Sequence, residues 1–154
     1  MGRIKRRIWN FLFGKRWLFV DDHRDPPENL SMVFDTVRDF DGLKEWVEVN
    51  GIPNLVSFDH DLHAEHTSFF YENGGWGSPP DPDQGCFVNP TGYELAEWLL
   101  RESVERGVHP RYMMVHSRNP LGSDRILSLL TAHTESHKTG SLCRKIRWGQ
   151  TPRK

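Results

Sequence analysis

The chain has 154 residues and a formal net charge of −1, a length that suits one compact domain with an ordinary hydrophobic core. No segment approaches the roughly 20 consecutive apolar residues of a membrane helix, and Cys86 and Cys143 lack the CxxC spacing of a zinc site. The sequence thus argues against a membrane span and a disulfide framework, and we expect a cytoplasmic protein with reduced thiols.

The charges are unevenly distributed along the chain. Residues 1–16 and 138–154 each contain six Lys or Arg and no acidic residue, whereas residues 17–137 hold all 21 Asp and Glu. We therefore expect a basic N-terminal extension (1–16), a domain (17–137) and a basic C-terminal tail (138–154). Such ends suit contact with nucleic acid or a membrane surface, although Lys and Arg are also common in solvated termini.

The first half of the chain predicts strands that alternate with a helix. Trp17–Val20 is a short apolar run of the kind found in buried strands, and 31–37 is a weaker strand candidate. Apolar residues at helical spacing predict a helix over 41–51, ended by a glycine. Leu55–Phe58 is then a third predicted strand.

The second half continues the alternation after a long irregular segment. Residues 62–90 show no sustained periodicity and contain several Gly and Pro, which predicts a lid, a binding loop or a disordered insert. Residues 91–94 have the form of a capping box, and an apolar stripe predicts a helix from there to Gly107. Tyr112–Val115 is a fourth predicted strand, followed by a helix near Pro120. No strand is predicted after that helix, because 134–138 is polar.

This alternation predicts an α/β fold, namely an open, mostly parallel sheet of about four strands with flanking helices. In such sheets ligands bind beyond the carboxyl ends of the strands. Three of the four predicted strands end in chemically capable residues, at 21–22, 59–61 and 116–117. We therefore expect these three segments to form one site.

Three aspartates are the candidate metal ligands. If the first and third strands are neighbours, Asp21, Asp22 and Asp59 face one crevice, where close carboxylates repel unless a proton or a cation neutralises them. Mg²⁺ or Mn²⁺ is the natural partner, because hard cations prefer oxygen ligands. The alternative is that Asp22 or Asp61 caps a turn and the remaining aspartates lie in solvent.

His60 is the candidate acid or base, because the neighbouring Asp61 can orient its ring and adjust its pKa toward neutrality. His63 and His66 follow at intervals of three, a spacing that would suit a metal site on a helical turn. No helix signal supports such a turn, and we interpret both as histidines of the loop.

The remaining candidates are phosphate-binding groups. Arg24 suits a phosphate or pairs with Asp25 or Glu28, two readings that the sequence leaves open. The turn 116–119 offers His116, Ser117 and Asn119 just before a helix whose free N–H groups favour anions. Asn119 is also placed to cap that helix. Aromatic residues of the loop suit base stacking or packing of the loop: Phe69, Phe70, Tyr71, Trp76 and Phe87.

Four ordered motifs resemble the cyclic-phosphate-processing receiver-like domains, divergent relatives of response-regulator receivers found in bacteria and their phages. These motifs are LFVDDHRDP at 18–26, SFDHDL at 57–62, TGYELAEWL at 91–99, and VHSRNP at 115–120 followed by Gly122 and Ile126. The resemblance spans about residues 17–133 and implies a receiver-like, flavodoxin-like sheet, reduced relative to a true receiver.

The resemblance also implies roles for individual residues. Asp21 and Asp22 match the metal-binding acids of a receiver, and Asp59 matches its phospho-acceptor aspartate. The features that set this branch apart are matched by Arg24, His60, Asp61, His116, Ser117 and Asn119, and we add Arg125 to the expected phosphate-binding residues.

The expected activity is a metal-assisted phosphoesterase that opens a cyclic phosphate on a nucleotide, an ADP-ribose derivative or an RNA end. The expected catalytic residues are Asp59, His60, Asp61 and His116. The alternatives are a module that sequesters a cyclic nucleotide, and a protein that binds nucleic acid or another partner through its basic ends. The sequence predicts no oligomeric state.

Two departures from a receiver stand out. A receiver has a fifth strand that ends in a lysine, whereas here Lys138 lies in a polar stretch with no apolar strand before it. This departure argues against phosphorelay signalling. The loop at 62–90 is also longer than expected, which predicts a different substrate choice.

Overall fold

The computed structural model describes residues 16–146, apart from 64, 67 and 69–87. The predictions made for residues 1–15 and 147–154, and for the aromatic residues Phe69, Phe70, Tyr71, Trp76 and Phe87, lie outside the described residues. The predicted basic extension and tail are therefore described only at Arg16 and over 138–146.

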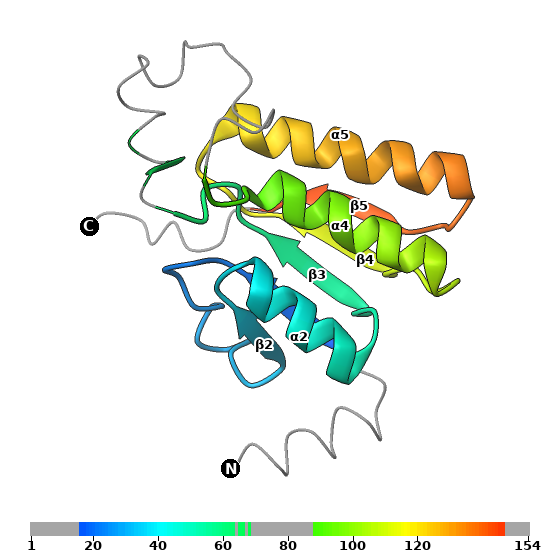
Figure 1. The fold of residues 1–154 in the computed structure, drawn as a ribbon, viewed down its shortest axis with the longest axis horizontal. Helices are drawn as coiled ribbons and strands as arrows, with labels where there is room; N and C mark the ends of the chain where they lie inside the picture. The colour runs from blue at the N-terminus through cyan, green and yellow to red at the C-terminus, as the bar shows by residue number, and fades with distance from the viewer. Residues whose placement is uncertain (1–15, 64, 67, 69–87, 147–154) are drawn as a thin grey trace.

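A parallel sheet forms the centre of the molecule (Figure 1). Its spatial order is β2-β1-β3-β4-β5, with all neighbours parallel. This order and the alternation with helices define a flavodoxin-like, receiver-type α/β fold, as the sequence predicts. The strands are β1 (Trp17–Val20), β2 (Phe34–Val37), β3 (Leu55–Phe58), β4 (Tyr112–Val115) and β5 (Leu142–Lys145).

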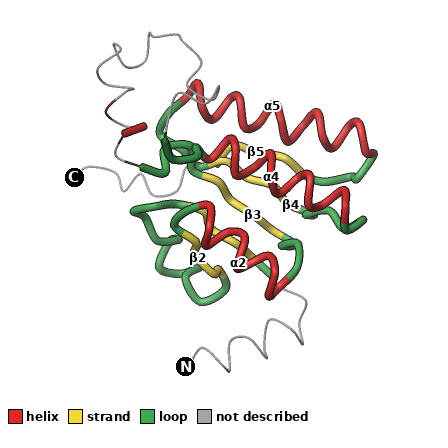
Figure 2. The backbone as a smooth tube through the Cα atoms, in the orientation of Figure 1, coloured by secondary structure: helices red, strands yellow, loops and turns green. Residues whose placement is uncertain are grey.

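The three helices lie on one face of this sheet (Figures 1 and 2). They are α2 (Phe40–Asn50), α4 (Gly92–Glu105) and α5 (Pro120–His137), and each links two parallel strands. Right-handed crossovers that all progress in the same direction across a sheet place their helices on the same face. The link from β1 to β2 runs in the opposite direction and has no helix among its residues.

Side chains of alternate strand positions fill the two faces of the sheet. On the helical side, Leu18, Val56 and Met113 are fully buried in a core that α2, α4 and α5 complete. On the other side, Phe19 and Phe34 form a smaller buried cluster. Both faces of the central strands β1 and β3 are therefore covered, which is why these strands are nearly continuous apolar runs in the sequence.

The predicted helix starts are present in the structure. The side chain of Glu94 accepts a hydrogen bond from the N–H of Thr91 at 2.7 Å, which completes the capping box of α4. Asn119 caps α5 by accepting from the N–H of Gly122 at 3.0 Å, with Pro120 at the first helical position. The local sequence thus fixes where both helices begin.

The prediction that no strand follows the last helix is wrong. Leu142–Lys145 forms β5 and pairs with β4, within the stretch predicted to be a tail. Three of its four residues are exposed because β5 is an edge strand paired on one side. Such a strand lacks the apolar run that identifies a buried strand, so the pattern search misses it.

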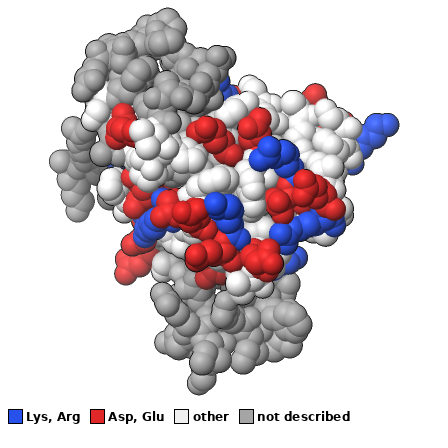
Figure 3. Space-filling view, viewed as in Figure 1, with Lys and Arg blue, Asp and Glu red and all other residues white. Residues whose placement is uncertain are grey.

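The charged surface over α2 and α4 mixes both signs (Figure 3). Ion pairs account for part of this mixture: Lys44 with Asp41, and Arg106 with Glu102 and Glu48. An intermixed surface of this kind lacks the single-sign field that steers nucleic acid. No helix among the described residues is long and apolar enough to cross a bilayer.

His66 lies in the segment between β3 and α4, as predicted, and its side chain is buried. Leu62 N–H donates to its Nδ1 at 3.1 Å, so Nε2 carries the proton and donates to the carbonyl oxygen of Asn89 at 2.9 Å. Burial lowers the pKa of His66. The ring thereby joins the two ends of the long loop next to the site.

A second buried histidine predicts how stability depends on pH. Burial and the imidazoles of His137 and His109 lower the pKa of His133 to about 4. The unfolded chain therefore takes up a proton at this residue near pH 6.5, whereas the folded chain takes it up only near pH 4. The free energy of unfolding should be highest above pH 6.5 and decrease by ~3 kcal/mol as the pH falls to 4.

Urea denaturation at several pH values measures this effect. His133→Gln should show a flatter dependence between pH 6.5 and 4, whereas His23→Gln, at an exposed position, should follow the wild type. If the free energy of unfolding of His133→Gln depends on pH as strongly as that of the wild type, His133 is not the source of the effect.

Candidate active site

The site lies where three neighbouring strands end. Val20 of β1 is in register with Phe58 of β3, which is in register with Val115 of β4. The next residue of each strand, Asp21, Asp59 or His116, is thus brought to one edge of the sheet. The predicted convergence of three strand ends is present in the structure.

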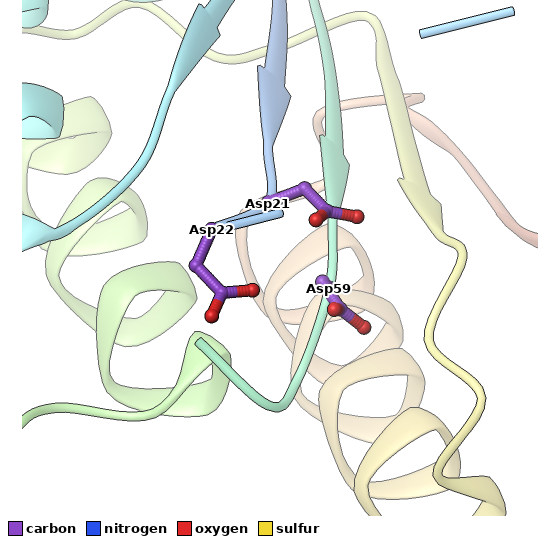
Figure 4. Close-up of side chains that lie close together, drawn as sticks. All are labelled: Asp21, Asp22 and Asp59. Carbon is purple, nitrogen blue, oxygen red and sulfur yellow. The ribbon is translucent and has the colours of Figure 1, made fainter. Parts of the chain in front are cut away.

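Asp21, Asp22 and Asp59 form an acidic cluster at this edge. Figure 4 shows their side chains gathered beyond the ends of β1 and β3, and one carboxylate oxygen from each lies within 4.8 Å of the others. Asp21 is fully buried and Asp59 is 5% exposed. The alternative that places Asp21 and Asp59 in solvent is therefore wrong.

The guanidinium of Arg24 lies between two of these carboxylates. Its Nε is 2.7 Å from Oδ2 of Asp21, and a terminal nitrogen is 2.7 Å from Oδ2 of Asp59. The reading in which Arg24 pairs with Asp25 or Glu28 is therefore wrong, because its partners are Asp21 and Asp59. Asp25 pairs with Arg38 instead. The loop that follows β1 folds back over the strand end, so the distant Asp59 becomes the partner.

The backbone of that loop also holds Asp21. The N–H groups of His23 and Arg24 donate to its Oδ1 at 3.0 and 2.6 Å. Arg38 donates to the carbonyl oxygens of Asp21 and Arg24 at 2.9 and 2.7 Å. Sequence reasoning missed Arg38, because nothing in its local pattern shows that it reaches back to the first strand.

The aspartates differ in how well their charge is stabilised. Burial opposes ionisation of Asp21, but the hydrogen bond from His116 and the groups of Arg24 outweigh it and lower the pKa. Burial and the charges of Asp21 and Asp59 raise the pKa of Asp22. Arg24 is held charged, because Asp59 and Asp21 raise its pKa against the effect of burial. Asp22 is thus the carboxylate whose negative charge is least compensated.

His116 is fixed by contacts on both ring nitrogens. Its Nε2–H donates to Oδ2 of Asp21 at 3.1 Å, so Nδ1 of the neutral ring accepts from the hydroxyl of Ser57 at 2.7 Å. The ring also stacks on Phe19, with centroids 4.2 Å apart. Sequence reasoning missed Ser57, although a hydroxyl inside an otherwise apolar strand is a signal that it has a buried partner.

His60 is paired with Asp61 as predicted, but its side chain is buried and does not face solvent. The ring is 1% exposed, and its Nδ1–H donates to Oδ1 of Asp61 at 2.7 Å. A Cβ added to Gly122 would lie 2.2 Å from the ring. The first turn of α5 therefore covers His60.

The turn 116–119 serves mainly to position groups. The Oγ of Ser117 accepts from the N–H of Asn119 at 3.1 Å, and the amide of Asn119 donates to Asp61 at 3.2 Å. Arg125 lies with its guanidinium 5.3 Å from the centre of the Tyr93 ring. Ser117, Asn119 and Arg125 thus all have protein contacts that explain their positions.

A lysine does end the fifth strand, although its partner is an aspartate of α5 and not the acidic cluster. Lys145 ends β5, and its Nζ lies 2.5 Å from Asp124 on the exposed side of α5. The premise that no fifth strand ends in a lysine is therefore wrong, whereas the expectation that the chain does not act in phosphorelay signalling stays a prediction.

The comparisons with known proteins give one result. A family described as the cyclic-phosphate processing receiver domain matches residues 16–132, well over half of the chain. No curated protein and no solved structure gives a significant match.

Proposed function

This chain belongs to the cyclic-phosphate processing receiver domain family, and on that premise we propose that it is a phosphoesterase that hydrolyses a cyclic phosphate. The substrate class is a nucleotide, an ADP-ribose derivative or an RNA end. In the reaction, water adds across one P–O ester bond of the ring, and the released ester oxygen takes up a proton.

The observation that carries this proposal is the arrangement of charge at the strand ends. A guanidinium held between Asp21 and Asp59 is a group that can also bind a phosphoryl oxygen. Asp22 lies beside it with its charge poorly compensated. The same strand ends therefore offer both a partner for a phosphate and a place for a cation.

The three carboxylates suit Mg²⁺ or Mn²⁺, since hard cations take oxygen ligands. We propose that Asp21, Asp22 and Asp59 hold the ion; when bound, it would polarise the phosphoryl group and lower the pKa of a water. Arg24 now compensates Asp21 and Asp59, so binding of a cation requires the guanidinium to leave at least one of them. A released guanidinium would be available to the phosphate.

The histidines are assigned roles that fit their burial. We propose that His116 holds its proton at Nε2 against Asp21 and transfers it at the strand end. His60, with Asp61, is proposed to complete the acid and base set, with the first turn of α5 needing to open for its ring to meet the substrate. Ser117, Asn119 and Arg125 are proposed to support the phosphate by their N–H, amide and guanidinium groups.

Removing the guanidinium tests its competition with the cation. In Arg24→Gln the acidic cluster loses its fixed positive charge, and we expect the affinity for Mn²⁺ to increase about tenfold, because like charges then remain uncompensated. Phosphate binding should weaken in the same variant. Calorimetric titration with Mn²⁺ measures the first effect, with Lys44→Gln, which removes a surface cation, as the control. Equal Mn²⁺ affinity in wild type and Arg24→Gln would rule out the competition.

A second candidate function is sequestration of a cyclic nucleotide without turnover. The near-complete burial of His60 and His116 favours it, because neither ring faces solvent freely as a general base would. Incubation with a cyclic nucleotide followed by mass analysis separates the two functions. Unchanged ligand recovered from a tight complex supports sequestration, whereas a hydrolysed product supports the phosphoesterase.

A further inference from the structure

Three histidines gather at the edge of the sheet opposite to the acidic cluster. His109 lies in the connection that leads into β4, and His133 and His137 are one turn apart near the end of α5. Because α5 runs back along the parallel strands, its end returns to the edge where β4 begins. The proposed function uses none of these residues.

Two of the three rings already lie at the spacing of metal ligands, whereas no choice of one nitrogen from each ring yet places all three within 4.8 Å of one another. Nδ1 of His109 is 3.2 Å from Nε2 of His133. Ring centroids are 5.2 Å apart for His109 and His133, 4.5 Å for His133 and His137, and 5.9 Å for His109 and His137. With Zn–N bonds of 2.0–2.1 Å at tetrahedral angles, two ligating nitrogens lie roughly 3.3 Å apart and their ring centres about 5 Å apart.

We propose that His109, His133 and His137 bind a transition-metal ion of the zinc class. His109 would bind through Nδ1, His133 through Nε2 and His137 through Nε2, with solvent in the fourth position. Imidazole nitrogen is a ligand that suits Zn²⁺ and not Mg²⁺. This site thus differs in ligand chemistry from the acidic cluster, and it would clamp the end of α5 to the connection before β4.

One ring must turn for the site to close. The Nδ1–H of His137 donates to the carbonyl oxygen of His133 at 3.1 Å, so only its Nε2 is proposed as a ligand. His137 is exposed, whereas His133 is 7% exposed, so His137 has the space to reorient toward a fixed partner. The metal would replace the hydrogen bond that now joins His109 and His133.

The alternative is that the three rings merely pack together. Packing explains the contact between His109 and His133, but it gives no reason for a third imidazole beside them, since protonated rings at these distances repel.

Titration of the full chain with Zn²⁺ in excess Mg²⁺ tests the site. We expect one zinc ion to bind, with affinity reduced at least tenfold in His109→Gln and in His137→Gln. Neither position is fully buried, so both variants should fold, which circular dichroism checks. The matched control His63→Gln, at a histidine outside the cluster, should bind zinc as the wild type does.

Replacing zinc by Co²⁺ gives an independent readout. A tetrahedral nitrogen site produces strong visible absorption bands, which His137→Gln should lose and Asp59→Asn should keep. Zinc affinity within twofold of the wild type in both histidine variants, or Co²⁺ bands that disappear with Asp59→Asn and survive His137→Gln, would overturn the proposal. Since neither readout uses turnover, failure here is distinguishable from failure of the proposed phosphoesterase.

Discussion

Asp59→Asn should reduce hydrolysis of a cyclic phosphate by about 10³-fold while the chain remains folded. Asp59 supplies one of the three clustered carboxylates and one of the two partners of Arg24. Asparagine keeps an oxygen that can accept from the N–H of His60, as Oδ1 of Asp59 does at 2.9 Å. The substitution therefore removes the charge and preserves the local hydrogen bond.

The matched control for this variant is Asp25→Asn. Asp25 is an exposed acid of the neighbouring loop that pairs with Arg38, so its neutralisation should leave turnover within about twofold, as expected for a surface pair. Initial rates of hydrolysis should be measured for the wild type, Asp59→Asn and Asp25→Asn, with thermal melts to verify that each is folded. Equal loss of activity in both variants would show that general charge, and not the cluster, matters.

Gly92→Ala should destabilise the fold by about 3 kcal/mol or more, a large effect for the addition of one methyl group. A Cβ at Gly92 would lie 1.7 Å from the carbonyl oxygen of Asp59 and 3.0 Å from Cα of His60. Both atoms belong to the backbone and cannot rotate away. Because α4 starts against the end of β3, the clash would also displace Asp59 from the acidic cluster.

Gly107→Ala provides the comparison for this prediction. A Cβ there would meet no atom within 4 Å, although Gly107 has a φ of +62°, so alanine should cost only about 1 kcal/mol of backbone strain. Chemical denaturation of the two variants measures the difference. Similar losses of stability in both would contradict the close packing of α4 on the strand end.

Three central strands and the helices were predictable because each has a strong local signal, whereas the edge strand β2 gave only a weak one. Trp17–Val20, Leu55–Phe58 and Tyr112–Val115 are short apolar runs, and their boundaries in the structure match the pattern. The capping residues at Thr91 and Asn119 locate the helix starts. Parallel strands that end in Asp21, Asp59 and His116 then have to share an edge, so the main part of the site follows from topology.

The features that sequence reasoning missed depend on contacts between distant residues. Strand β5 is recognisable only by its pairing with β4. Arg24 contacts Asp59 only because the loop after β1 folds back over the end of the strand. The burial of His60 has the same origin, because α5 covers it at Gly122. His60→Ala would therefore open a cavity, and His60→Gln is the better test of its chemical role.

The most direct test of the proposed function is the mass of the product. The wild-type chain should be incubated with 2′,3′-cyclic, 3′,5′-cyclic and ADP-ribose cyclic phosphates, each with Mg²⁺, Mn²⁺ or a chelator. We expect one of these three classes of cyclic phosphate to gain the mass of one water when a metal is present. The chelator and the Asp59→Asn substitution should each prevent this gain. Hydrolysis that persists at the wild-type rate in Asp59→Asn, or no mass change for any of the three classes, would contradict the proposed function.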